Sequence, residues 1–264
     1  MDAKELIAAG RLADALKALQ AEVRQEPGDR NLRVFLFQLN CVLGHLDKAL
    51  TQLQVIASLD ADAMMLAQIF RPVIACEMLR RDVFAGRRTP LIFGEPAEWV
   101  GLLVQANALV AGGQFAAAAD VRARAFEAAP AVAGTLDGQP FEWIADADSR
   151  LGPLLEVILD GKYYWVPFSR IARMEMDKPT DLRDLVWTPM RFVWTNGGAV
   201  TGHVPVRYAG TENAPDDALK LARSTTWQEA APDCFLGLGQ RVLATDAGDH
   251  PLLECRAIEL NATA

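Results

Sequence analysis

The chain has 264 residues, of which 51% are hydrophobic and 23% are charged, and this balance is typical of a folded globular protein. Its formal net charge of −8 disfavours nucleic acid as a partner, because an acidic surface repels the phosphate backbone. The four cysteines form no CxxC pair and match no zinc framework, so we expect buried free thiols and no metal site.

The first residues enter an amphipathic helix without a basic segment or a long apolar run. This pattern predicts neither a signal peptide nor a membrane span, and we therefore expect a cytoplasmic protein that does not act at a membrane.

The N-terminal half repeats itself. A Gly-x-Leu-x-x-Ala-Leu pattern starts at Gly10 and again at Gly44, 34 residues later, which is the tetratricopeptide period. A third copy starts at Gly113, with Phe115 in the position of the leucine. Glycine permits the tight turn between paired helices, and small alanines let the helices approach closely. Residues 1–133 are therefore predicted to form a tetratricopeptide-like α-helical repeat solenoid, whose concave groove suits a peptide or a partner helix.

The segment 62–88 has helical periodicity, with Pro72 inside it. A proline in a helix interior predicts a kink or a break. Four arginines occupy the end of this segment: Arg80, Arg81, Arg87 and Arg88. We expect them on a solvated helix end, where cations interact favourably with the helix dipole.

Residues 134–264 have the patterns of strands. The dipeptide Asp160-Gly161 between residues 154–159 and 162–167 predicts a hairpin. Further strands are expected over residues 190–194, 199–206, 241–244 and 252–260, the last two joined by a turn at 246–249. We predict an α+β multidomain protein in which the helical repeat domain, 1–133, precedes an antiparallel β-rich, small barrel-like domain, 134–264.

The junction between the halves carries Asp146, Asp148 and Arg150. Paired carboxylates are suited to acid–base work or to an outer metal contact. The alternative is a turn in which the carboxylates accept backbone N–H groups and pair with the arginine. We favour the second interpretation, in which the three residues form a charged clasp between the halves that borders a partner's site.

Other catalytic patterns are weak. The chain has three histidines and no Gly-x-Ser-x-Gly elbow, and the Gly237–Gly239 stretch lacks the residues that a phosphate-binding loop requires. We therefore predict no enzyme and no catalytic, metal or cofactor-binding residue.

Aromatic residues are concentrated in the expected strands. Base stacking is one use of such residues, but the acidic charge favours core packing or a protein-binding face. The candidate partner-binding or clasp residues are Asp146, Asp148, Arg150, Tyr163, Trp165, Arg183, Asp184, Trp187 and Trp227.

Several blocks together carry a family resemblance. They are Ala9-Gly10-Arg11-Leu12, Asp137-Gly138, Ile144 to Pro153, Gly161 to Pro167, Leu182 to Trp187, Val204 to Tyr208, Thr226-Trp227 and Gly237 to Arg241. In order and spacing the chain resembles the ImpE family, also called TagJ or SciE-type, an accessory protein of bacterial type VI secretion. The matching blocks span nearly the whole chain.

The resemblance implies a non-enzymatic adaptor that binds the small subunit of the contractile sheath through a helix of that subunit. It also implies a modulatory effect on sheath assembly or disassembly and an indirect link to the AAA+ disassembly ATPase. Two alternatives stay open from the residues: an enzyme with an acidic Asp146/Asp148/Arg150 site, and a purely structural scaffold.

Overall fold

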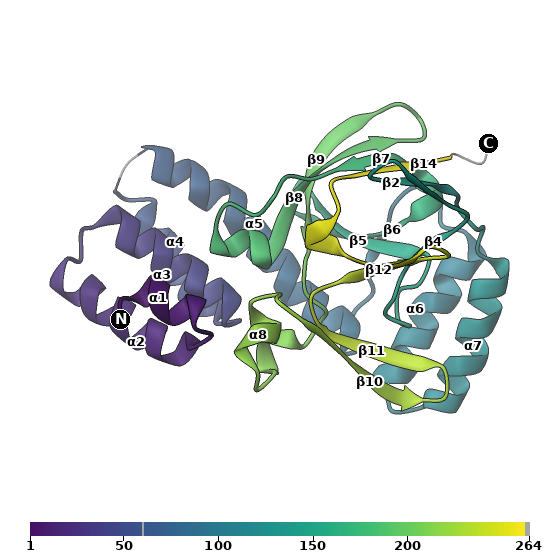
Figure 1. The fold of residues 1–264 in the computed structure, drawn as a ribbon, viewed down its shortest axis with the longest axis horizontal. Coiled ribbons are helices and arrows are strands. Elements are labelled where there is room, and N and C mark those ends of the chain that lie inside the picture. The colour runs from purple at the N-terminus through teal and green to yellow at the C-terminus, as the bar shows by residue number, and fades with distance from the viewer. Residues whose placement is uncertain (60, 262–264) are drawn as a thin grey trace.

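The computed structural model describes residues 1–59 and 61–261. Helices fill the N-terminal half and strands the C-terminal half, so the chain is an α+β protein (Figure 1). The α-helices of the described residues are α1 (Ala3–Ala8), α2 (Leu12–Gln25), α3 (Arg30–Val42), α4 (Leu46–Ile56), α5 (Ala61–Phe84), α6 (Glu98–Ala111), α7 (Phe115–Ala128) and α8 (Asp217–Lys220). Among them, none combines the length and the apolarity that crossing a bilayer requires.

The glycines of the sequence pattern lie in the turns between paired helices. Gly10, Gly44 and Gly113 have φ angles of 70°, 69° and 71°, the left-handed conformation that glycine adopts without steric cost. These turns join α1 to α2, α3 to α4 and α6 to α7, and the helices of each pair pack together. The helical N-terminal half is therefore confirmed.

Helix α5 runs unbroken through Pro72, so the expected break does not occur. The expectation for its arginines is wrong at Arg80, which is 3% exposed. The physical reason is that the C-terminal half of α5 packs on the sheet, where the carboxylate of Glu156 faces Arg80. Arg81 is half-buried, and only Arg87 and Arg88 are exposed as expected.

The strands of the described residues form three sheets, with orders β1-β6-β5-β9-β8-β7-β14-β2-β3, β13-β12-β4 and β10-β11. Their bounds are β1 (Leu91–Ile92), β2 (Gly134–Leu136), β3 (Gln139–Phe141), β4 (Ile144–Asp146), β5 (Leu154–Leu159), β6 (Lys162–Pro167), β7 (Ile171–Glu175), β8 (Trp187–Trp194), β9 (Ala199–Pro205), β10 (Thr225–Ala231), β11 (Cys234–Gly239), β12 (Val242–Thr245), β13 (Gly248–Pro251) and β14 (Ala257–Leu260). Four 3₁₀ turns accompany them: η1 (Phe168–Arg170), η2 (Leu182–Leu185), η3 (Thr211–Asn213) and η4 (Leu252–Glu254). The large sheet is mixed rather than purely antiparallel, because β1 pairs with β6 in parallel.

The turn residues predict the paired strands correctly in two hairpins and wrongly in a third. The pair β5–β6 has the expected register, and Asp160 and Gly161 have φ angles of 47° and 70°, as a tight hairpin turn requires. The pair β8–β9 is also present. The predicted pairing of residues 241–244 with 252–260 is wrong: β12 pairs with β13, whereas β14 joins β7 and β2 in the large sheet. The short turn of residues 246–247 leaves β13 as the nearest strand that can pair with β12.

Two hydrophobic cores lie side by side. The first contains the inner faces of the helices together with Leu154, Ile158 and Trp165 from the sheet. The second lies within the β-rich half and includes Val157, Phe192 and Ile258. Alternate residues of β5 therefore enter different cores, and the first core is shared by both halves of the chain. The division at residue 133 stays a prediction. All four cysteines are free and buried, as expected.

Candidate functional site

The junction stretch folds into a turn built by its own carboxylates. Strand β4 ends at Asp146, whose Oδ1 accepts the backbone N–H of Asp148 at 2.9 Å. The Oδ1 of Asp148 accepts the N–H of Arg150 at 2.9 Å, and its Oδ2 accepts the N–H of Gly237 on β11 at 2.8 Å. The carboxylates therefore hold backbone groups, as short acidic side chains do in turns.

Arg150 closes the turn and reaches the helical half. Its Nε lies 2.8 Å from Asp148 Oδ1 and its Nη2 2.5 Å from Oδ2, a bidentate ion pair. The guanidinium lies 4.8 Å from the ring centroid of Phe84 at the end of α5, in a cation–π contact. The turn thus contacts α5 directly.

A chain of buried charges continues from Asp146 to α5. Arg241, fully buried, forms ion pairs with Asp146 and with Glu156 in the middle of β5. Glu156 also forms an ion pair with Arg80 of α5, whose Nε lies 2.6 Å from Glu156 Oε1 and whose Nη2 lies 2.9 Å from Glu156 Oε2. Four side chains from β4, the start of β12, β5 and α5 therefore alternate in charge across the junction.

The polar tips of three aromatic residues complete this cluster. The Tyr163 hydroxyl donates to Glu156, and Trp165 Nε1 donates to the Tyr163 oxygen at 2.7 Å. Trp187 Nε1 donates to Glu77 Oε2 of α5 at 2.8 Å. The side chains of all three aromatic residues are fully buried, so they lie between α5 and the sheet rather than on an exposed face.

Arg207 and Tyr208 attach further segments to the cluster. Arg207 donates to the carbonyl oxygens of Val42 at 2.7 Å and Lys220 at 2.6 Å, which are at the C-terminal ends of α3 and α8. The Tyr208 hydroxyl accepts the N–H of Val242 at 2.9 Å and donates to Asp146 Oδ1 at 3.1 Å. Arg207 therefore satisfies helix-end carbonyls that would otherwise be buried without a partner.

Sequence reasoning did not include six further residues of this cluster, namely Glu77, Arg80, Glu156, Arg207, Tyr208 and Arg241. One signal pointed to them. Glu156 is the only charged residue in the apolar run Leu154–Leu159, and a charge in a buried strand requires a partner of opposite sign. The sequence contains no local indication of which arginine that partner is.

Burial and pairing set the charges of the cluster. Burial raises the pKa of Asp146 to about 6, although Arg241 acts in the opposite direction. Burial also opposes the ionisation of Glu156, but Arg80 and Arg241 outweigh it and hold the pKa of this carboxyl at about 2. Burial lowers the pKa of Arg207 to about 10. At neutral pH Glu156 is therefore a buried anion held between two arginines.

The other candidate residues are Arg183 and Asp184 of η2 and Trp227 of β10, and the ring centroid of Trp227 lies 5.4 Å from that of Tyr208 in the cluster. Arg183 pairs with Asp181, and its guanidinium lies 4.7 Å from the ring centroid of Phe70. Asp184 accepts the N–H of Thr180 at 2.8 Å and is buried. Trp227 on β10 is 39% exposed.

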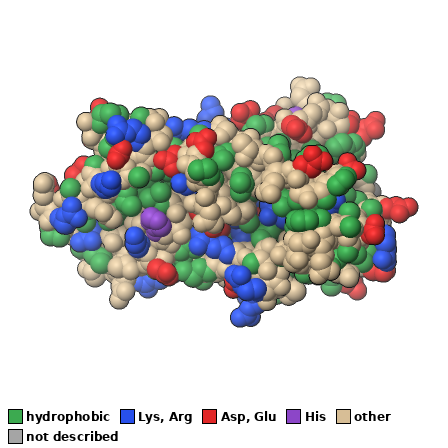
Figure 2. Space-filling model, turned by 90° about the horizontal axis from the view of Figure 1, so that it is seen from below, with side chains coloured by type: hydrophobic (Ala, Val, Ile, Leu, Met, Phe, Trp, Pro, Cys, Tyr) green, Lys and Arg blue, Asp and Glu red, His purple; other side chains and the backbone are tan. Residues whose placement is uncertain are grey.

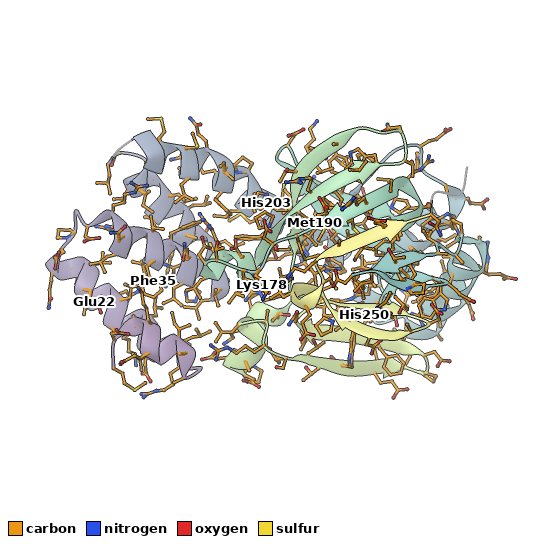
Figure 3. All side chains as sticks on the ribbon, turned by 45° about the horizontal axis from the view of Figure 1, so that its top comes forward. Glu22, Phe35, Lys178, Met190, His203 and His250 are labelled. Atoms are coloured by element: carbon orange, nitrogen blue, oxygen red, sulfur yellow. The ribbon has the colours of Figure 1, made fainter. Side chains whose placement is uncertain are left out.

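The two histidines of the β-rich half lie on separate strands. His203 on β9 and His250 on β13 are far apart (Figure 3). Within residues 1–59 and 61–261, no group of three or more His, Cys, Asp or Glu side chains is placed to hold a metal ion. The paired charges of the junction therefore have the arrangement of an interior ion-pair network.

An open groove of about 870 Å³ lies between the first helices and the segment that precedes β8. Its walls come from α1, α3 and residues 179–185, and we call it the α1–α3 groove. Its apolar lining includes Ile7, Leu32, Phe35, Leu182 and Leu185. Figure 3 labels Phe35 on α3. Except for Ile7, these apolar side chains are only half-buried, so the groove presents apolar surface to solvent.

Comparisons with known proteins give one consistent result. A family model described as ImpE protein matches residues 138–259. The type VI secretion system accessory component TagJ of Pseudomonas aeruginosa is 49% identical over 263 residues, which cover 100% of this chain and 92% of that protein. The X-ray crystal structure of protein VPA1032 from Vibrio parahaemolyticus is similar with a TM-score of 0.90 at 26% identity, covering 98% of this chain and 97% of the other. The similarity thus includes both the helical and the β-rich half.

Proposed function

This chain belongs to the ImpE family of type VI secretion accessory proteins, and from this premise we propose that it is a non-enzymatic adaptor that binds the small subunit of the contractile sheath through a helix of that subunit. Binding modulates sheath assembly or disassembly and links the sheath indirectly to the AAA+ disassembly ATPase. The protein acts in the cytoplasm, where contracted sheath is available to it.

The observation that carries the proposal is the full-length similarity to an accessory component. The similarity covers 100% of the chain and therefore includes the helical half, which in our proposal supplies the helix-binding surface. Paired helices of the tetratricopeptide kind stack into surfaces that capture peptides and helices, and we extend the proposal to that repeat arrangement and to a barrel-like closure of the sheet.

The geometry of the junction supports an adaptor better than an enzyme. Asp146 and Asp148 are buried, and each is paired with an arginine. A general acid or base must reach a substrate proton, which a buried and fully paired carboxylate does not do. We propose that the cluster holds the helices and the sheet in a fixed relative position, so that a partner meets a preorganised surface.

The experiment is a calorimetric titration of the purified full chain with the purified small sheath subunit from the same secretion system. We expect a Kd of about 1 μM or tighter, because a helix laid in an apolar groove buries enough surface for such affinity. The absence of heat and of co-elution at high micromolar concentrations would contradict the proposal and favour a structural scaffold.

A further inference from the structure

We propose that the α1–α3 groove is the docking site of an amphipathic helix that carries acidic residues along one flank. The inference rests on the proposed function only in assigning that helix to the small sheath subunit. The shape and the charge of the groove carry the rest.

The apolar lining has the spacing of helix packing. Leu32 and Phe35 are three residues apart on α3, and Leu182 and Leu185 are three residues apart on η2. Residues three apart on a helix lie on one face, and in a 3₁₀ turn they are directly above each other. Each wall therefore presents an apolar ridge. A third helix with apolar residues at every third or fourth position can insert its side chains between two such ridges.

The charge of the groove selects an acidic helix. Its charged lining residues are Lys4, Asp181 and Arg223. Asp181 is neutralised by its ion pair with Arg183. Within the described chain, neither Lys4 nor Arg223 lies at ion-pair distance from a carboxylate, and Arg223 donates to the carbonyl oxygens of Ile7 and Ala8 at 3.1 and 2.9 Å. Two cations without a carboxylate partner among the described residues therefore border the apolar lining, although the whole chain carries a net charge of −8.

Both cations project from positions that a docked helix would reach. Lys4 is an exposed residue of α1. Arg223, from the segment after α8, is also exposed, and its guanidinium lies at the C-terminal end of α1 and binds the last carbonyl oxygens of that helix. Figure 2 shows blue Lys and Arg side chains beside green hydrophobic ones on the face seen from below. Glutamate or aspartate on the flank of the incoming helix would pair with these cations, which fixes the direction and register of docking more than it adds affinity.

The test is a titration of the full chain and three variants with the purified small sheath subunit at low ionic strength. Phe35→Gln removes an apolar side chain from the lining of the groove and is expected to weaken binding about 10-fold or more. Lys4→Glu reverses a border charge and is expected to weaken it about 3-fold. Lys17→Glu, an exposed lysine on α2 outside the groove, is the matched control and should bind like the unmodified chain.

The outcomes separate the two proposals. If the unmodified chain does not bind, the proposed function fails and the inference fails with it. If it binds and both Phe35→Gln and Lys4→Glu bind equally well, the adaptor function stands and the groove is not its site. Should Phe35→Gln unfold, Lys4→Glu decides: this exposed side chain forms no ion pair within the described residues, and binding equal to that of Lys17→Glu would overturn the proposal. Stronger binding by Lys4→Glu would show that the docked flank is basic and would also overturn it.

Discussion

At the scale of single residues, the charges between α5 and the sheet depend on one another. Glu156 forms ion pairs with Arg80 and with Arg241, and Arg241 also pairs with Asp146. Taking one member away leaves another charge buried without compensation, which costs more free energy than the intact pair contributes. Glu156 has no exposed surface, and it is the anion that Arg80 and Arg241 share.

Replacing Glu156 by Gln is expected to lower the free energy of unfolding by about 3–5 kcal/mol at pH 7, because Arg80 and Arg241 lose their shared anion. The pKa of Glu156 is about 2 in the folded protein against an ordinary value of 4.5. A lowered carboxyl pKa stabilises the folded state above the unfolded value, and this stabilisation is lost as the pH falls through the folded one. The deficit of Glu156→Gln should therefore shrink between pH 4.5 and about pH 2.

Urea unfolding of the unmodified chain and of Glu156→Gln over this pH range measures the difference in their free energies of unfolding. Glu229→Gln, an exposed glutamate on β10, is the control and should follow the unmodified chain at every pH. A deficit that stays constant down to pH 2 would show that the charge of Glu156 is not what stabilises the junction.

At the scale of elements, the turn of the hairpin β5–β6 approaches α5 closely at Pro72. Gly161 in its turn has φ 70°, and a Cβ added there would lie 2.9 Å from Cβ of Pro72. The proline inside α5 is therefore a contact surface for the turn. Glycine is required at this position for two reasons, the left-handed backbone and the close approach.

Gly161→Ala should lower the free energy of unfolding by about 1–2 kcal/mol for the left-handed conformation and by about 1–3 kcal/mol more for the overlap with Pro72. Gly197→Ala is the matched control: φ there is 84° in the β8–β9 hairpin turn, and no atom lies within 4 Å of its added Cβ. Denaturant unfolding of both variants isolates the overlap as the difference between them. Equal losses would mean that the hairpin moves away from α5 at no cost.

At the scale of the whole molecule, the two halves share a core and a sheet. Strand β1 comes from the helical half and pairs with β6. Glu77 and Arg80 of α5 provide partners for Trp187 and Glu156 of the sheet. Each half alone would expose apolar surface of the shared core and leave buried polar groups unsatisfied, and a marginally stable fold does not tolerate both.

We therefore expect that neither residues 1–133 nor residues 134–264 fold when produced separately, and that co-production restores a soluble complex. Circular dichroism and thermal unfolding of each fragment measure this directly. Cooperative unfolding of either fragment by itself would show an autonomous domain and would support the boundary that the sequence suggests.

The sequence by itself determined the features that local physics controls. The glycines at Gly10, Gly44 and Gly113 mark helix turns because few other residues adopt positive φ, and Asp160-Gly161 marks a hairpin for the same reason. The family blocks indicated the relationship that the full-length comparison supports. Each turn signal lies within a few consecutive residues, and the family resemblance consists of short blocks in a fixed order along the chain.

Only the tertiary structure decided which residues face one another. Arg80 has the pattern of a solvated helix end, and it is buried because Glu156, 76 residues away, lies opposite it. The last strand, β14, pairs with β7 and β2 of the large sheet rather than with β12. Whether a charge is buried depends on what packs over it, and that is settled by contacts between distant segments, for which a single sequence contains no local signal.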